Sequence, residues 1–371
     1  MSDPDASHAQ GQPRQWGLTR AGITLRVLVA VAAVVVIAAG VFAYTTITRI
    51  QLNPNRQAAW AGRAATAVAV GPHGTLYAAF LREIYEINTD AGTVSRIAGR
   101  ATDPAPGQPS PAADGDAALG AAIRPTALAI GPRGQVYFAD QLSSTIRTIE
   151  GGNLKSLGRA QELGGLAVKQ SDGTVYFSDQ LTDQVFGINP VSGGVAPVAG
   201  NAQPGFAGDG GPALAAELAH PDGLAVQSGR LLIADSGNDR IREVDLRTGV
   251  ITTVAGTGKK GQAGDGHQAT SAQLDSPAAV AADPEGGYAF SDQGNHRVRH
   301  VSPHGVITTI AGSGQAGSDS PQASVGAAGA HLKQPAALVY AGQDLYFVDN
   351  FQLRLLQGGR VSYFTPPGDP S

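Results

Sequence analysis

An aspartate ends the same short apolar segment five times along the chain, and a ring of carboxylates is a candidate site for a metal ion. Each of these aspartates precedes a turn, where a carboxylate commonly accepts hydrogen bonds from backbone N–H groups. Recurrence favours this structural role, because a binding site needs only one copy. The five residues are Asp140, Asp179, Asp235, Asp292 and Asp349.

A second group of aspartates lies in glycine-rich segments between the repeats. Asp116, Asp209 and Asp265 each have at least one glycine as an immediate neighbour. Calcium takes about six to eight oxygen ligands, several of them carboxylates, and one aspartate per loop supplies too few. We therefore expect turn residues at these positions and predict no metal ion.

The histidines and glycine motifs do not form a catalytic pattern. His296, His300 and His304 are four residues apart, but in a strand and turn this spacing does not bring the rings together. Two segments, Gly256–Gly261 and Gly312–Gly317, match the dinucleotide-binding pattern G-x-G-x-x-G, but neither opens a helix in a β–α–β unit. No G-x-S-x-G motif occurs. We expect no cofactor and assign no catalytic residue.

Composition narrows the possible classes further. The chain of 371 residues has a net charge of −4, which argues against nucleic-acid binding driven by positive charge. It has no cysteine, so disulfides, a cysteine-ligated zinc site and a cysteine nucleophile are excluded. With 50 glycines, 23 prolines and 42% hydrophobic residues, we expect short apolar runs between glycine-rich turns, as in an all-β protein. No nucleic-acid partner is predicted.

One apolar segment near the N-terminus is long enough to cross a membrane. No charged residue lies between Arg26 and Arg49, and residues 27–44 are almost wholly apolar. A helix of about 20 such residues spans a bilayer. Because Arg14 and Arg20 also precede the segment, we expect a cytoplasmic N-terminus, an exported remainder and a single-pass location in the cell membrane.

The apolar segment sets the first domain boundaries. We expect a cytoplasmic tail at 1–22, a transmembrane signal-anchor helix at 23–47 and a linker at 48–63. The alternative is a secreted protein, released by cleavage of a signal peptide near the small residues of Val41–Ala43. The apolar run of a signal peptide is about 7–15 residues long, which favours the uncleaved anchor here.

Six copies of one repeat follow the linker. Each has a small apolar strand, a glycine turn, a Tyr- or Phe-rich strand, an alternating strand, a second glycine turn and a closing strand. Successive copies are 39 to 60 residues apart, and the first has Phe80 in place of the repeated aspartate. This pattern predicts a six-bladed β-propeller over 64–364 and a C-terminal tail at 365–371. A β-sandwich, the second candidate fold, would not need so regular a spacing.

Two of the copies resemble the NHL repeat most clearly. His220–Val226 precedes Asp235–Arg242, and Pro277–Val280 precedes Asp292–Arg299, each with the pattern Pro-x-Gly/Ala-Leu/Val and then Asn-x-Arg-Ile/Val-Arg. The resemblance implies an all-β, six-bladed propeller of NHL type. The chain is similar to the sensor domains of membrane-anchored actinobacterial receptor Ser/Thr kinases, although its predicted cytoplasmic tail is too short for a kinase domain.

The resemblance leaves two classes of function open. NHL-like amidating lyases bind zinc with three channel-facing histidines, and of the matching positions here only His220 carries one. The first strands otherwise contain mostly Ala, Leu, Val and Gly. We therefore favour a binding, scaffold or sensor module over an enzyme. The alternative is a propeller lyase or lactonase, similar to gluconolactonases or amidating lyases, with a metal in the central channel.

The predicted fold places several loops on one face. In a four-stranded meander, the turn between the second and third strands lies on the same side as the connections between repeats. Loops on a rigid scaffold commonly carry binding sites. We therefore predict that an extracytoplasmic protein, peptide or glycan binds this face. Candidate ligand-binding residues are Asn238, Asp239, Asn295, His296, Phe206, Asp209, Asp265 and His267.

Overall fold

The computed structural model describes residues 60, 63–100, 110–320 and 323–367. The chain divides into two compact units, Met1–Gln51 and Leu52–Ser371, and every described residue belongs to the second. The predicted cytoplasmic tail, the transmembrane helix at 23–47 and most of the linker lie outside the described residues. Within the described part of the chain, no helix is long and apolar enough to cross a membrane.

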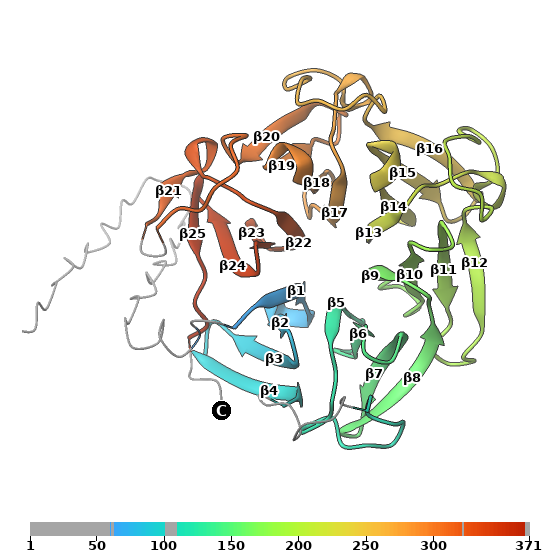
Figure 1. Ribbon diagram of the computed structural model, residues 1–371, viewed down its shortest axis with the longest axis vertical. Coiled ribbons are helices and arrows are strands. Elements are labelled where there is room, and N and C mark those ends of the chain that lie inside the picture. Colours follow the sequence, from blue (N-terminus) through green and yellow to red (C-terminus); the bar gives the residue numbers. More distant parts are fainter. Residues whose placement is uncertain (1–59, 61–62, 101–109, 321–322, 368–371) are drawn as a thin grey trace, which may run out of the picture. The chain divides into compact units, whose positions relative to one another are not determined.

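Six antiparallel sheets surround a common centre and confirm the predicted six-bladed β-propeller (Figure 1). The strands of the first three blades are β1 (Ala65–Val70), β2 (Leu76–Phe80), β3 (Glu83–Asn88), β4 (Thr93–Gly99); β5 (Pro125–Ile130), β6 (Val136–Asp140), β7 (Thr145–Glu150), β8 (Asn153–Arg159); β9 (Leu163–Val168), β10 (Val175–Asp179), β11 (Gln184–Ile188) and β12 (Val195–Ala199). Those of the last three are β13 (Pro221–Gln227), β14 (Arg230–Asp235), β15 (Arg240–Asp245), β16 (Val250–Ala255); β17 (Pro277–Ala282), β18 (Tyr288–Asp292), β19 (Arg297–Val301), β20 (Ile307–Ala311); β21 (Val325–Gly326), β22 (Pro335–Ala341), β23 (Asp344–Asp349), β24 (Gln352–Gln357) and β25 (Arg360–Tyr363).

Short 3-10 turns occupy several of the connections. They are η1 (Pro72–Gly74), η2 (Ala213–Ala215), η3 (Ser236–Asn238), η4 (Ala269–Ser271), η5 (Gln293–Asn295) and η6 (Ala327–Gly329). Three of them, η2, η4 and η6, lie in the long connections between blades, and each buries its first alanine. A single turn suffices there because the segment only has to place one small residue against the outer strand.

The position of a strand in its blade determines its burial. The first strand of each blade lies nearest the centre and the fourth lies at the rim (Figure 1). Every residue of the second strands β6, β10 and β18 is buried, whereas β12 at the rim is mostly exposed. Second strands carry the run of Tyr, Phe, Val and Ala because neighbouring blades cover both of their faces.

The hydrophobic core lies between blades. One cluster joins Leu232 and Ile241 of blade 4 to Val280 and Phe290 of blade 5, and five further clusters repeat the arrangement around the ring. Each blade therefore buries its apolar faces against its two neighbours, as expected when a single four-stranded meander cannot enclose a core.

The last blade closes the ring against the first. β25, from the C-terminal segment, is the fourth strand of blade 6, with the two-residue β21 outside it, and Ala65 N donates a hydrogen bond to Phe351 O across the junction at 2.8 Å. Blade 1 lacks the repeated aspartate, and Phe80 packs there with Trp60 and Tyr85 at ring-centroid distances of 5.2 to 5.8 Å. An aromatic cluster thus occupies the place that an Arg–Asp ion pair has in blades 2, 4, 5 and 6.

Two glycines allow the first strands to approach closely at the centre. A Cβ atom on Gly223 would lie 2.4 Å from the Cα atom of Ala279, and one on Gly165 would lie 2.7 Å from the Cα atom of Gly223. The opposing atoms are backbone atoms, so no side-chain rotation relieves the overlap. These glycines set the spacing of blades 3, 4 and 5 and therefore the width of the channel.

We expect Gly223→Ala to destabilise the propeller by about 1–3 kcal/mol, because overpacking forces the backbone of two blades apart. Chemical denaturation followed by circular dichroism measures the change. Gly326→Ala is the matched control, since a Cβ there meets nothing within 4 Å and the residue is not in the left-handed region. Equal stability of the Gly223 variant and the wild type would show that the blades yield at this contact.

Candidate functional site

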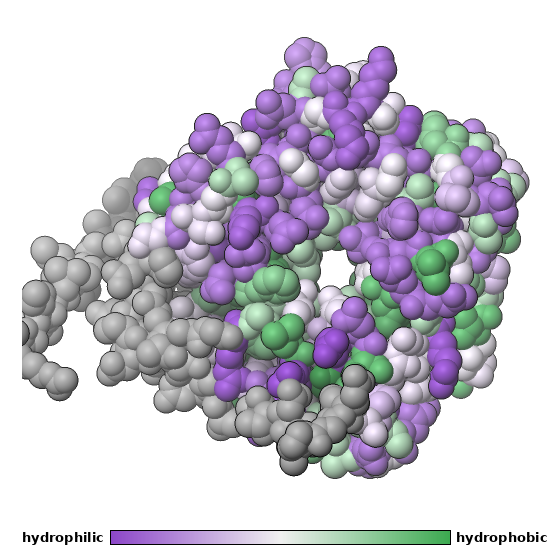
Figure 2. Space-filling view, in the orientation of Figure 1, coloured by the Kyte–Doolittle hydropathy of each residue, from purple (hydrophilic) through white to green (hydrophobic). Residues whose placement is uncertain are grey.

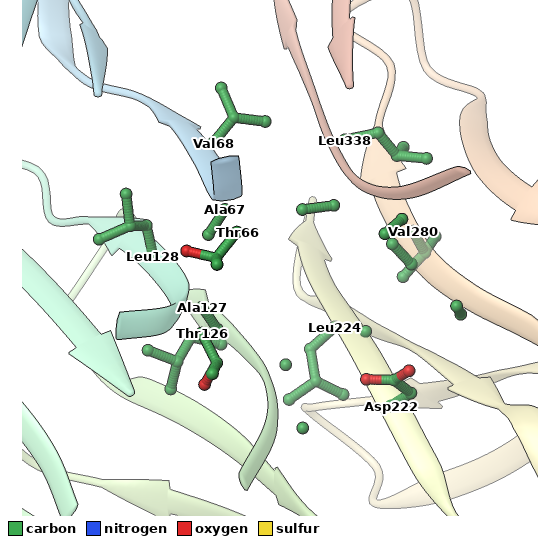
Figure 3. Close-up of a pocket in the computed structure, with 18 of the residues that line it drawn as sticks. Thr66, Ala67, Val68, Thr126, Ala127, Leu128, Asp222, Leu224, Val280 and Leu338 are labelled. Atoms are coloured by element: carbon green, nitrogen blue, oxygen red, sulfur yellow. The ribbon is translucent and has the colours of Figure 1, made fainter. Parts of the chain in front are cut away.

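Three stacked rings of residues line the channel at the centre of the propeller. Each first strand contributes three consecutive residues to a cavity of about 180 Å³ (Figure 3). The first ring is Thr66, Thr126, Gly164, Asp222, Ala278 and Ala336. The second is Ala67, Ala127, Gly165, Gly223, Ala279 and Ala337, and the third is Val68, Leu128, Leu166, Leu224, Val280 and Leu338.

The three rings differ in chemistry. The first mixes hydroxyl groups with one carboxyl group, the second is made of alanine and glycine, and the third is wholly aliphatic. Gln293 from the turn after β18 completes the lining. The opening is visible from one face at the centre of the propeller, bordered by both hydrophilic and hydrophobic surface (Figure 2). The channel is therefore amphipathic along its length.

Asp222 carries the only carboxyl group among the nineteen residues that line this cavity, and none of the nineteen is Lys, Arg or His. Its carbonyl oxygen accepts a hydrogen bond from Ser178 Oγ at 2.7 Å, which fixes the backbone of β13 against β10. Burial raises the pKa of Asp222 to about 7, although a hydrogen bond from the Gln180 side chain favours the ionised form. The other five blades have Thr, Thr, Gly, Ala and Ala at this position.

The first ring opens into a wider mouth of about 240 Å³. Thr66, Thr126, Gln293 and Ala336 line both spaces. The mouth is completed by residues of blade 6 and of the junction with blade 1, which are Ala65, Gln334, Val348, Asn350 and Phe351. It lies on the side of the turns between second and third strands, the side on which the sequence predicts a ligand.

Phe351 at this mouth has an unusual backbone conformation. Asn350 and Phe351 form the two-residue turn between β23 and β24, and their φ angles are +48° and +64°. A two-residue hairpin with both angles positive favours Asn followed by Gly. A bulky residue in the left-handed region is strained by about 1–2 kcal/mol. Phe351 is nevertheless 52% exposed.

Other exposed apolar side chains occupy the same turn in other blades. Leu81 follows β2 and is 48% exposed, and Leu181 follows β10 and is 60% exposed. Both turns point to the same side as that of Phe351, because every blade has the same strand order around the ring. The face around the mouth therefore presents apolar groups from blades 1, 3 and 6.

The five repeated aspartates lie in five different blades, where they bind backbone amides. Asp140 Oδ1 accepts hydrogen bonds from Arg124 N at 2.8 Å and Leu142 N at 3.2 Å. The counterparts in the other blades bind the residues that precede their first strands, in the pairs Asp179–Gln161, Asp235–Ala219, Asp292–Asp275 and Asp349–Lys333. Each contact ties the end of a second strand to the start of the first strand.

A fully buried arginine joins the repeated aspartate to the loop aspartate. Arg242 Nη1 lies 3.3 Å from Asp235 Oδ2, and its Nη2 lies 2.7 Å from Asp209 Oδ1. Arg299 repeats the arrangement with Asp292 at 3.4 Å and Asp265 at 2.8 Å. The same clusters occur in blades 2 and 6 as Arg147 with Asp140 and Asp114, and Arg354 with Asp349 and Asp319.

In the cluster of Arg299, the pKa values of the repeated and the loop aspartate shift in opposite directions. Burial raises the pKa of Asp292 to about 6, even though Arg299 favours its ionised form. The pKa of Asp265 is lowered instead, because hydrogen bonds from Thr309 and Arg299 outweigh its burial. In blade 2 the loop partner of Arg147 is Asp114, whereas Asp116, which the sequence singled out, accepts a turn hydrogen bond from Ala113 N at 2.7 Å.

The remaining candidates from the sequence also make contacts within the chain. Asn238 Nδ2 donates to Gly205 O at 2.7 Å, and Asn295 Nδ2 donates to Gly261 O at 2.6 Å. Asp239 Oδ1 accepts from Ser276 N, His296 Nδ1 contacts Lys333 O and Phe206 packs against Arg240, each linking to the following blade or loop. His267 Nδ1 contacts Asp265 O in its own loop. Their polar atoms hold the loops in place, and none of the eight candidates lines the channel.

The donor set of the channel does not fit a metal ion. Within the described part of the chain, no three His, Cys, Asp or Glu side chains are placed to hold one. His220, the histidine that matched a channel position by sequence, is not among the lining residues, and its backbone N donates to Asp183 Oδ1 at 2.8 Å. A lyase or lactonase with a channel metal would need more ligands than Asp222 supplies.

Two residues of the candidate site were not singled out from the sequence. Asp222 was visible as an acid at a position where the other repeats have small or hydroxyl residues. Phe351 was visible as a departure from the repeat pattern, after Asn350, where a tight turn favours glycine. Both are exceptions to the repeat, whereas the sequence prediction relied on what the repeats share.

Comparison with known proteins supports the fold. No family model matches the chain. The Arabidopsis thaliana protein SUPPRESSOR OF QUENCHING 1, chloroplastic, is 30% identical over 152 residues, covering 34% of this chain and 14% of that protein. The matched part is thus a small fraction of the relative's length.

Solved structures give a similar result. An auxiliary nutrient-binding protein from Bacteroides ovatus has a TM-score of 0.56 at 16% identity, covering 81% of this chain and 70% of that one. A gluconolactonase from Xanthomonas campestris has a TM-score of 0.51 at 14% identity, covering 81% and 86%. At these identities the likeness shows the fold alone. Fold and site together define a six-bladed β-propeller with an amphipathic central channel.

Proposed function

We propose that this chain is a membrane-anchored, extracytoplasmic binding module of NHL-repeat type, a scaffold or a sensor. A projecting group of a protein, peptide or glycan enters the mouth of its channel. The observation that carries the proposal is the channel itself, which combines the carboxyl group of Asp222 with an exposed, strained Phe351 at the mouth. The anchor is the apolar segment 27–44.

The shape of the cavity favours a slender projecting group. The mouth of about 240 Å³ leads into a channel of about 180 Å³, where the first strands approach closely at Gly165 and Gly223. Phe351 lines the mouth, and the exposed apolar side chains of Leu81 and Leu181 are on the same side of the propeller, where they offer a surface to the rest of the partner.

The alternative function is a propeller lyase or lactonase. The structural likeness to a gluconolactonase raises this possibility, but the likeness extends to the fold alone. The channel offers one carboxyl group, no histidine and no cluster of metal ligands among the described residues. Binding requires only shape and complementary groups, which the channel has, so we favour the binding module.

Photo-crosslinking tests where the ligand binds. Benzoylphenylalanine is placed at Phe351 in the full chain, expressed in the cells that make it. Val191 is the control position, 93% exposed in a turn between third and fourth strands on the opposite face. We expect defined adducts from position 351 and none from position 191. Equal adducts from both positions, or none from 351, would contradict the proposal.

Replacing Phe351 with glycine separates stability from binding. We expect Phe351→Gly to stabilise the propeller by about 1 kcal/mol, because glycine adopts a positive φ without strain, and to abolish ligand capture. Thermal unfolding and competition for the crosslinked partner measure the two effects. Val191→Gly is the control, an exposed residue in a turn on the opposite face that does not have a positive φ. A stabilised variant that still competes would contradict a binding role for the ring.

A further inference from the structure

Asp222 is a charged exception in a ring of small residues, and its backbone is fixed from two sides. Ser178 Oγ donates to Asp222 O at 2.7 Å and accepts from Gly165 N at 2.7 Å. On its other side, Gly223 lies against Ala279 so closely that no Cβ fits between them. The main chain at Asp222 therefore cannot withdraw from the channel without separating the blades.

The carboxyl group lacks a cationic partner in the channel. Its surroundings favour the neutral acid through burial and the anion through the hydrogen bond from Gln180. The neighbouring first strands, β9 and β17, contain no charged residue. The other elements packed on β13 contribute Asp179 from β10 and Asp235 and Arg230 from β14, while η3 contributes no charge. An ionised carboxyl group that is largely shielded from water is costly unless a cation pairs with it.

The surroundings of the carboxyl group define the shape of its partner. On one side of the first ring lies the open mouth with Phe351. On the other side lie the alanine and glycine ring and then the aliphatic ring of Val68, Leu128 and their counterparts. A projecting group that enters from the mouth reaches Asp222 with its tip, so the tip would carry the positive charge and a slender apolar chain behind it would pass Val348 and Phe351 of the mouth. An alkylammonium group has this form.

We propose that Asp222 binds a primary ammonium group at the tip of the ligand's projecting group, with the attached aliphatic chain leading back through the mouth past Val348 and Phe351. This inference rests on the proposed binding function and names the chemistry that the channel recognises. The ammonium group supplies the missing counter-charge and up to three N–H donors. The hydroxyl groups of Thr66 and Thr126 and the amide of Gln293 lie in the same cavity.

The probe for this site is n-butylammonium chloride, with n-butanol as its neutral counterpart of similar length. Isothermal titration calorimetry on the full chain at pH 8 is expected to show butylammonium binding to the wild type. Asp222→Asn keeps the shape and removes the charge, and should weaken that binding at least 10-fold without changing the weak binding of butanol. Asp172→Asn is the charge-matched control in the exposed turn after β9.

Acid should weaken butylammonium binding in the wild type. With a pKa of about 7, roughly one carboxyl in thirty is ionised at pH 5.5, so affinity should fall about 30-fold between pH 8 and pH 5.5. The Asp222→Asn variant should show no such dependence. Equal butylammonium binding by wild type and variant would overturn the inference, as would no binding by the folded wild type.

The result also distinguishes this inference from the proposed function. If butanol and butylammonium bind equally and Asp222→Asn changes neither, the channel is a binding site without charge recognition, and only the ammonium inference fails. If adducts from position 351 are also missing, the proposed function fails as well.

Discussion

Arg242→Met is expected to destabilise the propeller by about 3–5 kcal/mol, because it leaves the buried Asp235 without its cationic partner. Both side chains of the pair are fully buried. The loop aspartate, Asp209, also loses its 2.7 Å contact, so the connection before blade 4 should loosen. Chemical denaturation followed by circular dichroism measures the loss, and proteolysis around Asp209 measures the loosening.

The control for this prediction is Arg247→Met in the exposed turn between β15 and β16, where we expect a change below about 0.5 kcal/mol. Blade 3 shows why the arginine is not needed everywhere. Phe186 occupies the equivalent position opposite Phe177, and the two rings stack at 5.2 Å. A loss of less than 1 kcal/mol in Arg242→Met would mean that the cluster does not hold the loop.

Asp222→Asn is expected to stabilise the propeller by about 1–4 kcal/mol at pH 8. The pKa of Asp222 is raised to about 7 in the folded protein, compared with about 3.9 in an unfolded chain, and each pKa unit corresponds to about 1.4 kcal/mol. Above pH 7 the folded wild type must hold a charge in the channel that the unfolded chain holds in water. The variant does not bear this cost.

The sign of the pH dependence provides an internal check. Below about pH 4 the carboxyl is protonated in both states, so wild type and variant should differ little. Between pH 4 and 7 the folded wild type binds the additional proton, so its stability falls as pH rises relative to that of Asp222→Asn. The pKa of Asp292 is raised in both proteins, so its contribution to the pH dependence of stability cancels from the comparison. A variant that is less stable than the wild type at pH 8 would contradict the raised pKa.

The fold could be predicted because its information is repeated. Six copies of an apolar strand that ends before a turn, such as the segments ending at Asp140 and Asp235, determine both the meander and the number of blades. Register follows from the same pattern, because a slip of one residue would expose the buried face. The way in which the ring closes could not be predicted from the repeat, because it depends on the atypical first and last blades.

The arginine clusters show what the repeat could not reveal. Arg242 stands in an alternating strand, where a charged residue indicates a solvent-exposed position. Its loop partner, Asp209, lies 33 residues earlier in a connection whose path the sequence does not fix. Blade 3 has neither the buried arginine nor the loop aspartate, and the connection that precedes it, between β8 and β9, is short. The buried ion pair and the long connection before a blade therefore occur together. That the arginine pairs with an aspartate of the preceding connection follows only from the way the neighbouring blades pack.

The channel was predictable in composition but not in chemistry. Alanine, glycine and leucine in the first strands indicate a narrow apolar channel, and the structure has one. Two residues depart from the repeat. Asp222 adds a carboxyl group to the channel, and Phe351 adds an exposed aromatic ring to its mouth. Their effect depends on burial and on backbone angles, which become defined only when the six blades surround the channel.

The most direct test of a ligand site built around Asp222 is a ¹³C NMR titration of its carboxyl group in the wild type, with Asp222→Asn to assign the signal. We predict a pKa of about 7 in the free protein. In saturating n-butylammonium chloride it should fall by at least one unit, because the bound cation favours the ionised form. A pKa near 4 that butylammonium does not move would contradict the account, since the carboxyl would then be an ordinary hydrated group.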